Sequence, residues 1–168
     1  MQWTQATAEK RLKELKMPDM PIMSVHPNGV NVSQDWFQKY KATCREFMRS
    51  LSDSVQELAF MNLNRDEFMD LLMGRKMPGN LSIRFRIPLI WGGKTDIDNL
   101  FMCGTFPQSQ NLDRFIIEQS GNDTIWLPNP AKKIYVPIHS TISGNGGNAV
   151  ADRLGQFAAT VAAGRHQS

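Results

Sequence analysis

The sequence predicts an α+β protein, and three observations carry this prediction. Apolar residues first recur at steps of three and four along residues 33–77, which is the spacing of one helix face. After residue 80 the apolar and polar residues alternate, which is typical of strands. Helical spacing returns at residues 148–164, behind a glycine-rich loop. We therefore expect an N-terminal helical hairpin with a long amphipathic helix, then a small, mostly antiparallel sheet of about four strands, and a C-terminal helix.

The chain is expected to form one domain preceded by an N-terminal segment. Residues 1–32 predict a short helix, with Leu12 and Leu15 on one side, followed by an extended connector with three prolines. Residues 33–168 predict a single α+β domain. Its expected parts are the helical hairpin at 33–77, the sheet with a short helix at 81–142, and the C-terminal helix at 148–164.

A long amphipathic helix is the clearest element of the first half. Ser33 is the expected N-cap, with Asp35 in the first turn. The apolar residues then step by 4, 4, 3, 4, 4 and 3 along one continuous seam. The seam consists of Trp36, Tyr40, Cys44, Phe47, Leu51, Val55 and Leu58. Apart from Cys44, these residues are also the predicted interaction face, because the seam can pack either on the domain or on a partner protein.

A second helix is expected to follow at Asn64. Asn64 and Glu67 have the spacing of a capping box, in which each side chain bonds the backbone of the other residue. Phe68, Leu71 and Leu72 predict its buried face, and Gly74 is expected to end it.

Four strands and a short helix are expected after residue 80. The first strand runs from Leu81 to Leu89, with an apolar face and a face that carries Arg84 and Arg86. Its partner is expected at residues 99–103, beyond a glycine turn. A short helix that buries Leu112, Phe115 and Ile116 should come next. The last two strands are expected at 124–128 and 133–138, joined by a tight turn.

Composition places few limits on function. The net charge is only +3 over 168 residues, which permits contact with nucleic acid or an acidic partner without requiring it. Cys44 and Cys103 lie far apart in the sequence, so we expect free thiols and no metal site or cofactor. The N-terminus is polar and charged, and no apolar stretch is long enough for a membrane span. We therefore expect a cytoplasmic protein, or cargo that is exported without a cleaved signal.

Several cations could form a basic face for nucleic acid. The two arginines of the first strand are two residues apart and so lie on the same side of it, and three lysines follow in two turns. The predicted nucleic-acid-binding residues are Arg84, Arg86, Lys94, Lys132 and Lys133. The alternative is an ordinary solvated strand face.

The segment from Arg84 to Asn111 resembles the finger of HNH nucleases, in which a strand, a loop, a second strand and a short helix hold one metal ion. Residues of the types found in such fingers occur at Pro88, Gly92, Gly93, Asp96, Asn99 and Leu100. The resemblance implies a nuclease or toxin domain that acts on nucleic acid. However, Arg86 stands where the finger places its general-base histidine, and Gln110 and Asn111 stand where a late metal ligand is expected. An arginine cannot act as a base at neutral pH. A degenerate finger, an active nuclease and a chance likeness all remain open.

Two further candidates lie near the C-terminus. Glycines follow a predicted strand and precede a predicted helix, so their backbone amides could bind an anion. This loop comprises Gly144, Gly146, Gly147 and Asn148. A flexible linker is the alternative, and no acidic residue lies where a dinucleotide site would need one. His139 stands beside Ser140 and Thr141, which would suit a small-ligand enzyme, although a strand-end histidine explains it equally.

The sequence favours a non-enzymatic interaction module over these alternatives. We expect a structural subunit or adaptor that binds another protein or a second copy of itself, with a secondary nucleic-acid contact through the basic face. A degenerate or active HNH-like nuclease is the alternative.

Overall fold

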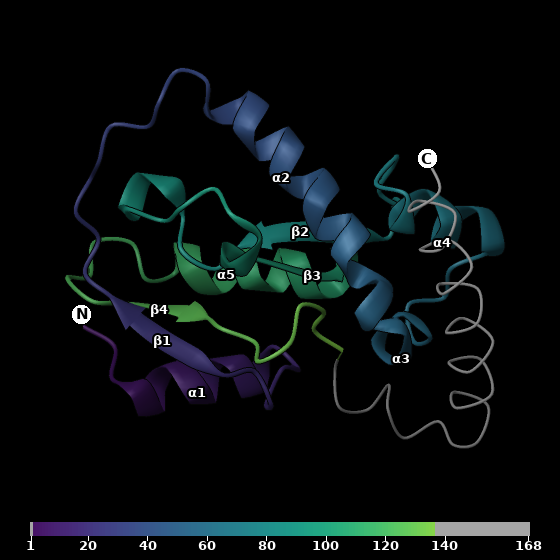
Figure 1. Cartoon of the computed structure of the whole chain (residues 1–168). Coiled ribbons are helices and arrows are strands. Elements are labelled where there is room, and N and C mark those ends of the chain that lie inside the picture. Colours follow the sequence, from purple (N-terminus) through teal and green to yellow (C-terminus); the bar gives the residue numbers. More distant parts are fainter. Residues whose placement is uncertain (1, 137–168) are drawn as a thin grey trace.

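The computed structural model describes residues 2–136, and these residues form an α+β fold as predicted (Figure 1). The helices are α1 (Gln5–Glu14), α2 (Trp36–Ser50), α3 (Val55–Leu58), α4 (Arg65–Leu72) and α5 (Gln110–Ile117). The strands are β1 (Ile22–Val25), β2 (Leu81–Phe85), β3 (Leu100–Gly104) and β4 (Ile125–Pro128). The predicted C-terminal helix, the glycine loop at 144–148 and His139 lie outside the described residues.

The four strands form two antiparallel pairs rather than the single sheet that we predicted. In one pair Phe85 of β2 lies opposite Leu100 of β3, and in the other Val25 of β1 lies opposite Ile125 of β4. Residues 133–135 connect the pairs, because the Met102 amide donates to the Lys133 carbonyl oxygen at 2.7 Å. The Tyr135 amide then donates to the Met102 carbonyl oxygen at 2.8 Å, so this short segment runs beside β3 in parallel.

We predicted that residues 124–128 and 133–138 pair as a hairpin. For the residues up to 136, which the structure describes, this prediction is wrong. Strand β4 pairs instead with β1, which lies in the segment expected to be an extended connector. The Asn129 amide continues this contact by donating to the Pro21 carbonyl oxygen at 2.8 Å. Prolines at 128 and 130 have no N–H to donate, which disfavours a tight two-strand ladder at this turn.

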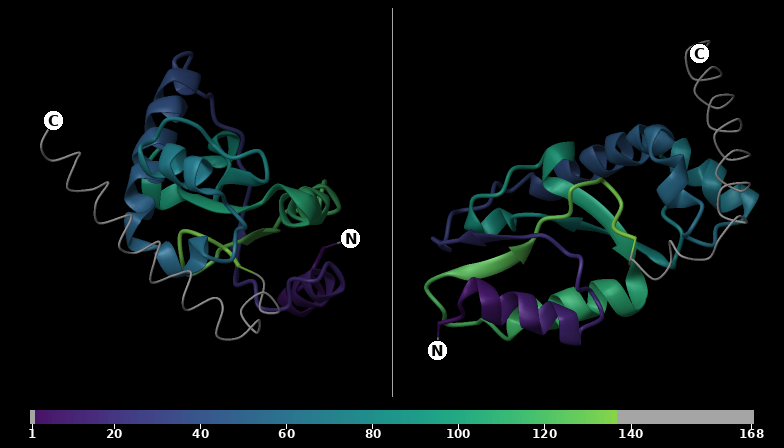
Figure 2. Two further views of the ribbon diagram at one scale, coloured as in Figure 1. Left: turned by 90° about the vertical axis from the view of Figure 1, so that its right-hand side faces the viewer. Right: turned by 90° about the horizontal axis from the view of Figure 1, so that it is seen from below.

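Strand β3 lies between two hydrophobic cores and contributes alternate side chains to each. Leu100 and Met102 pack in a core formed with α2, α3, α4 and β2. Phe101 and Cys103 point the other way, into a core formed with α1 and α5. All four side chains are buried. The result is three layers, with α1 and α5 on one side of the strands and α2 on the other (Figures 1 and 2).

The predicted long helix is broken, and the predicted two-helix hairpin is not formed. Helix α2 ends at Ser50, a single tight turn covers Leu51–Asp53, and α3 is a separate turn. The polar side chains at the break bond locally: the Ser50 hydroxyl donates to the Phe47 carbonyl oxygen at 2.6 Å, and the Ser54 hydroxyl donates to Asp53 at 2.9 Å. Such local bonds compete with the helix ladder.

The helix ends were predicted with mixed success. The capping box of α4 is confirmed, since the Glu67 amide donates to Asn64 and the Asn64 amide donates to Glu67. Gly74 ends this helix region with a φ of +70°, a conformation that favours glycine. Ser33 is not the N-cap of α2. Asp35 holds that position, and the Ser33 hydroxyl donates to the Asp35 carboxylate.

Candidate functional site

Arg84, the first of the predicted nucleic-acid contacts, forms hydrogen bonds and an ion pair within the protein. Its side chain is 13% exposed, and Nη1 lies 2.7 Å from the Asp113 carboxylate of α5. The same nitrogen lies 3.0 Å from the Ser109 carbonyl oxygen and 2.9 Å from the Ser109 hydroxyl. The basic side of β2 therefore faces the start of α5.

Arg86 lies just beyond β2 and holds the turn at residues 129–132. Its guanidinium donates to the Pro130 carbonyl oxygen at 2.5 Å, to the Asn129 side chain at 3.2 Å and to the Lys132 carbonyl oxygen at 3.2 Å. It also lies over the Phe101 ring, 5.5 Å from its centroid. Burial lowers the pKa of this guanidinium from its ordinary value.

The three predicted lysines lie in two loops: Lys94 between β2 and β3, and Lys132 and Lys133 at the turn to which Arg86 donates. Lys132 pairs with Glu57 at 2.7 Å, and Lys133 pairs with Asp53 at 3.0 Å, so both link the turn to the α3 region. Lys94 is exposed in the loop between β2 and β3. Of the five predicted cations, four hold internal partners, and the structure does not gather the set into one open face.

The loop with the HNH-like sequence is organised around the Asn99 side chain. Its Nδ2 donates to the carbonyl oxygens of Ile87 and Lys94, and its Oδ1 accepts from the Ile87 amide at 3.0 Å. The order of elements is strand, loop, strand and helix, as in the finger that the sequence resembles. Gln110 is exposed at the start of α5, and Asn111 donates to the Leu15 carbonyl oxygen at 3.3 Å. Within residues 2–136, no three His, Cys, Asp or Glu side chains group to hold a metal ion.

The predicted interaction face is divided between the core and the surface. Phe47, Leu51 and Leu58 are buried, while Tyr40 and Val55 are half-buried against the same core. Trp36 is the member of this face that stays well exposed, at 40%.

An exposed apolar patch surrounds Trp36, and most of it was missed by sequence reasoning. The apolar patch comprises Val30 (46% exposed), Trp36, Phe37 (50%) and Ile90 (54%). The Trp36 and Phe37 rings lie 5.5 Å apart. The Val30 amide donates to the Ile90 carbonyl oxygen at 3.0 Å, which fixes the segment before α2 against the β2–β3 loop. These two segments run close together at one end of the molecule (Figure 1).

The apolar patch borders a hollow of about 270 Å³. Trp36 and Val30 line it from one side, and Leu89 and Gly92 line it from the other. A signal for this patch was present in the sequence, since the adjacent Trp36 and Phe37 cannot both lie on one narrow helical seam.

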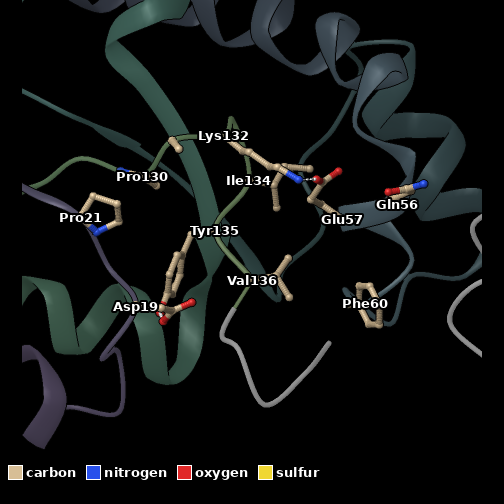
Figure 3. Close-up of a pocket in the computed structure, with 11 residues that line it drawn as sticks. Asp19, Pro21, Gln56, Glu57, Phe60, Pro130, Lys132, Ile134, Tyr135 and Val136 are labelled. Atoms are coloured by element: carbon tan, nitrogen blue, oxygen red, sulfur yellow. Dashed lines mark hydrogen bonds and ion pairs between the residues drawn. The ribbon is translucent and has the colours of Figure 1, made fainter. Parts of the chain in front are cut away.

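A second hollow, of about 360 Å³, lies beside residues 130–136 (Figure 3). Phe60, Ile134 and Val136 form much of its apolar wall. At one end the Tyr135 hydroxyl donates to Asp19 at 2.6 Å, and burial together with this bond raises the pKa of the phenol. At the other end stands the Lys132–Glu57 ion pair. The ionisable groups that line this hollow are thus paired with one another.

The two cysteines are free thiols, as predicted. Cys103 is buried, and its burial raises the pKa of the thiol to about 12. Cys44 is half-buried beside Tyr40, and burial raises the pKa of its thiol too. Neither thiol is therefore ionised at neutral pH.

None of the helices within residues 2–136 has the length and apolar character needed to cross a bilayer. Comparisons of the chain with protein-family models, with curated proteins and with solved structures found no match.

Proposed function

We propose that this protein is a non-enzymatic interaction module that binds another protein through the apolar patch. One observation carries the proposal: Val30, Trp36, Phe37 and Ile90 are each at least 40% exposed, and Val30 and Trp36 of this patch line a hollow. Grouped apolar side chains at a hollowed surface mark sites of protein contact. Tryptophan is also among the residues that contribute most to binding energy when a partner covers them.

The surroundings of the apolar patch support a preformed binding surface. Tyr40 packs against Phe85 of β2 with ring centroids 5.2 Å apart, so the start of α2 is held on the sheet. The opposite wall is held by the Asn99 bonds that shape the β2–β3 loop. A surface that is already ordered loses little conformational entropy when a partner binds.

Site-specific photo-cross-linking in the native host tests this proposal. Benzoylphenylalanine replaces Phe37 in the full chain, and the matched control replaces Phe106, which is 75% exposed and follows β3 at the other end of the hairpin. We expect a discrete protein adduct from position 37 that position 106 does not give, and that Trp36→Ser abolishes. An adduct near twice the 19.0 kDa mass of the chain would identify a second copy as the partner. Identical adducts from both positions, or none from position 37, would contradict the proposal.

A degenerate HNH-like nuclease is the second candidate, and the strand–loop–strand–helix order of β2, β3 and α5 favours it. Against an active enzyme stands Arg86, which occupies the place of the base and is bonded to three acceptors. Light scattering after size exclusion, with and without a short DNA duplex, tests this candidate together with the predicted basic face. A shift onto DNA at low salt that disappears at high salt would favour nucleic acid binding. Metal-dependent cleavage of the duplex would instead support an active nuclease.

A further inference from the structure

Strand β2 has an open edge on the side away from β3. Just past the end of this strand, the Arg86 amide donates to the Asn99 carbonyl oxygen across the pair at 2.7 Å. In an antiparallel pair such bonded residues alternate with residues whose backbone groups point away from the neighbouring strand. The backbone N–H and C=O groups of Ile83 and Phe85 therefore face away from β3. Within residues 2–136 no group forms a hydrogen bond with them.

The edges of the other strands are protected. Residues 133–135 run along the second edge of β3. The Gln119 side chain covers the outer edge of β4, where it accepts from the Trp126 amide at 2.6 Å and donates to the Trp126 carbonyl oxygen at 2.9 Å. Strand β1 is only four residues long and lies between Pro21 and Pro27. Short strands and flanking prolines are common ways to keep an edge from pairing.

Strand β2 has none of these protections. No proline or lysine occurs within Leu81–Phe85. The one charged residue of the strand, Arg84, is paired with Asp113 of α5. Ile83 and Phe85 are half-buried and pack at the margin of the core on the α2 side. A flat, apolar edge with unpaired backbone groups is a template for another strand.

We infer that β2 pairs antiparallel with β2 of a second copy of this chain, around a two-fold axis at Ile83, to form a symmetric dimer. The two Ile83 residues then exchange both of their outward backbone hydrogen bonds. Each Phe85 amide donates to the Leu81 carbonyl oxygen of the second copy. The surface is self-complementary, as a two-fold interface requires, because the same groups meet from both sides.

The side chains of β2 favour this partner and this register. With Ile83 on the axis, each Arg84 lies opposite Ser82 of the second copy, so no like charges oppose each other. An axis one residue further along would place the two Arg84 side chains directly opposite, which is unfavourable. The half-buried side chains of Ile83 and Phe85 would meet those of the second copy and extend the α2-side core across the axis. This interface uses no residue of the apolar patch, so it goes beyond the proposed function.

Light scattering after size exclusion tests the inference on the full chain. We expect a mass near twice 19.0 kDa. Ile83→Lys and Ile83→Glu each place two like charges on the axis, so each variant alone should have the mass of one chain. A mixture of the two variants should restore the dimer, because lysine then lies opposite glutamate. Ile117→Lys, at an isoleucine of α5 that is 68% exposed, is the matched control and should stay dimeric.

Amide hydrogen exchange in the unaltered chain gives a second measurement, which holds even if the variants at position 83 fail to fold. The amides of Ile83 and Phe85 should exchange slowly in the dimer and about tenfold faster after dilution to the monomer. The Arg84 amide faces β3 and should stay protected at both concentrations.

A chain that stays at 19.0 kDa, with fast exchange at Ile83 and Phe85 at every concentration, would overturn the inference. Slow exchange of these amides in a species of one chain mass would show that another part of the same chain covers the edge. Protection of the amides only in a complex with a different protein would replace the second copy by that protein.

A dimer that survives Ile83→Lys would place the contact between copies on another surface and would also overturn the inference. Loss of that dimer in Trp36→Ser would assign the contact to the apolar patch. The proposed function is decided separately, by the cross-linking at position 37.

Discussion

Arg84 and Arg86 act as internal connectors, because each guanidinium bonds segments that are distant in sequence. Arg84 joins β2 to Ser109 and Asp113, and Arg86 joins the end of β2 to residues 129–132. A guanidinium presents several donors in a fixed plane, so it can satisfy several carbonyl oxygens of a loop at once. These two cations therefore stabilise the fold around the site.

Arg84→Ala is expected to lower the free energy of unfolding by about 2 kcal/mol, because it leaves the buried Ser109 groups without their donor. Urea denaturation measures this change. Arg45→Ala, at an exposed position of α2, is the matched control and should change stability by less than about 0.5 kcal/mol. Weaker DNA binding by Arg84→Ala with unchanged stability would instead place this residue in a nucleic acid face.

The raised pKa of the Tyr135 phenol should make the protein less stable in alkali. Its phenol is 5% exposed, and burial followed by the bond to Asp19 raises its pKa above the ordinary 10.0. Above pH 10 the unfolded chain loses this proton while the folded chain keeps it, so the free energy of unfolding falls as the pH rises. Below pH 10 this group adds no pH dependence.

Tyr135→Phe should make this alkaline decline shallower and should cost about 1 kcal/mol at pH 7 through the lost hydrogen bond. Urea midpoints between pH 7 and pH 11 measure both effects. Some decline should remain in the variant, because burial also raises the pKa of Tyr40, to about 12. If the urea midpoints of Tyr135→Phe and of the unaltered protein fell equally between pH 7 and pH 11, the raised pKa of Tyr135 would be contradicted.

At the scale of elements, the β2–β3 loop is shaped by one side chain and one glycine. The Asn99 side chain bonds the backbone of Ile87 at the start of the loop and of Lys94 in its middle, and Gly93 lies close to this contact. A Cβ at position 93 would overlap the Ile87 carbonyl oxygen and lie 2.9 Å from Asn99 Nδ2. The same loop supplies Leu89 and Gly92 to the hollow of the apolar patch, so its shape matters for binding.

Gly93→Ala should therefore destabilise the protein by about 2 kcal/mol or more, because backbone atoms cannot move aside cheaply. It should also weaken binding at the apolar patch. Gly79→Ala is the matched control, since no atom lies within 4 Å of the Cβ it would add, and its stability should stay within about 1 kcal/mol. Thermal unfolding followed by circular dichroism compares the two, and equal effects would refute the role of Gly93.

At the scale of the whole molecule, β3 makes the two cores a single cooperative unit. Phe68 lies in the core on the α2 side and Phe115 in the core on the α1 side, and neighbouring residues of β3 pack into both. Loss of either core exposes one face of β3 and removes the packing that holds this strand in place, and the other face of the same strand fills the second core, so we expect the two cores to unfold together.

Phe68→Leu and Phe115→Leu should each lower the free energy of unfolding by about 1–2 kcal/mol and should shift one shared transition. Tryptophan fluorescence and circular dichroism should report the same midpoint, and Phe106→Leu, at an exposed ring, should leave it in place. Separate transitions in either variant would show that the cores unfold independently.

The features that the sequence determined by itself are those that depend on neighbours a few residues away. The capping box of Asn64 and Glu67 closes within one turn, and the buried side of α5 repeats at helical spacing. The alternation in β2 and the pairing of β2 with β3 across one loop were also predictable. These contacts join residues that are close in the sequence, so forming them costs little loop-closure entropy, and the sequence pattern is enough to predict them.

Only the tertiary structure decided which distant segments meet, and this determined the candidate site. Strand β1 pairs with β4 across about a hundred residues, and Arg86 reaches acceptors more than 40 residues away. Leu51 and Leu58, at and after the break of the predicted long helix, are buried, whereas Trp36 and Phe37 at its start lie at the surface. A pattern shows that a residue is apolar, but whether the fold covers it depends on competing long-range contacts, which no short stretch of sequence contains.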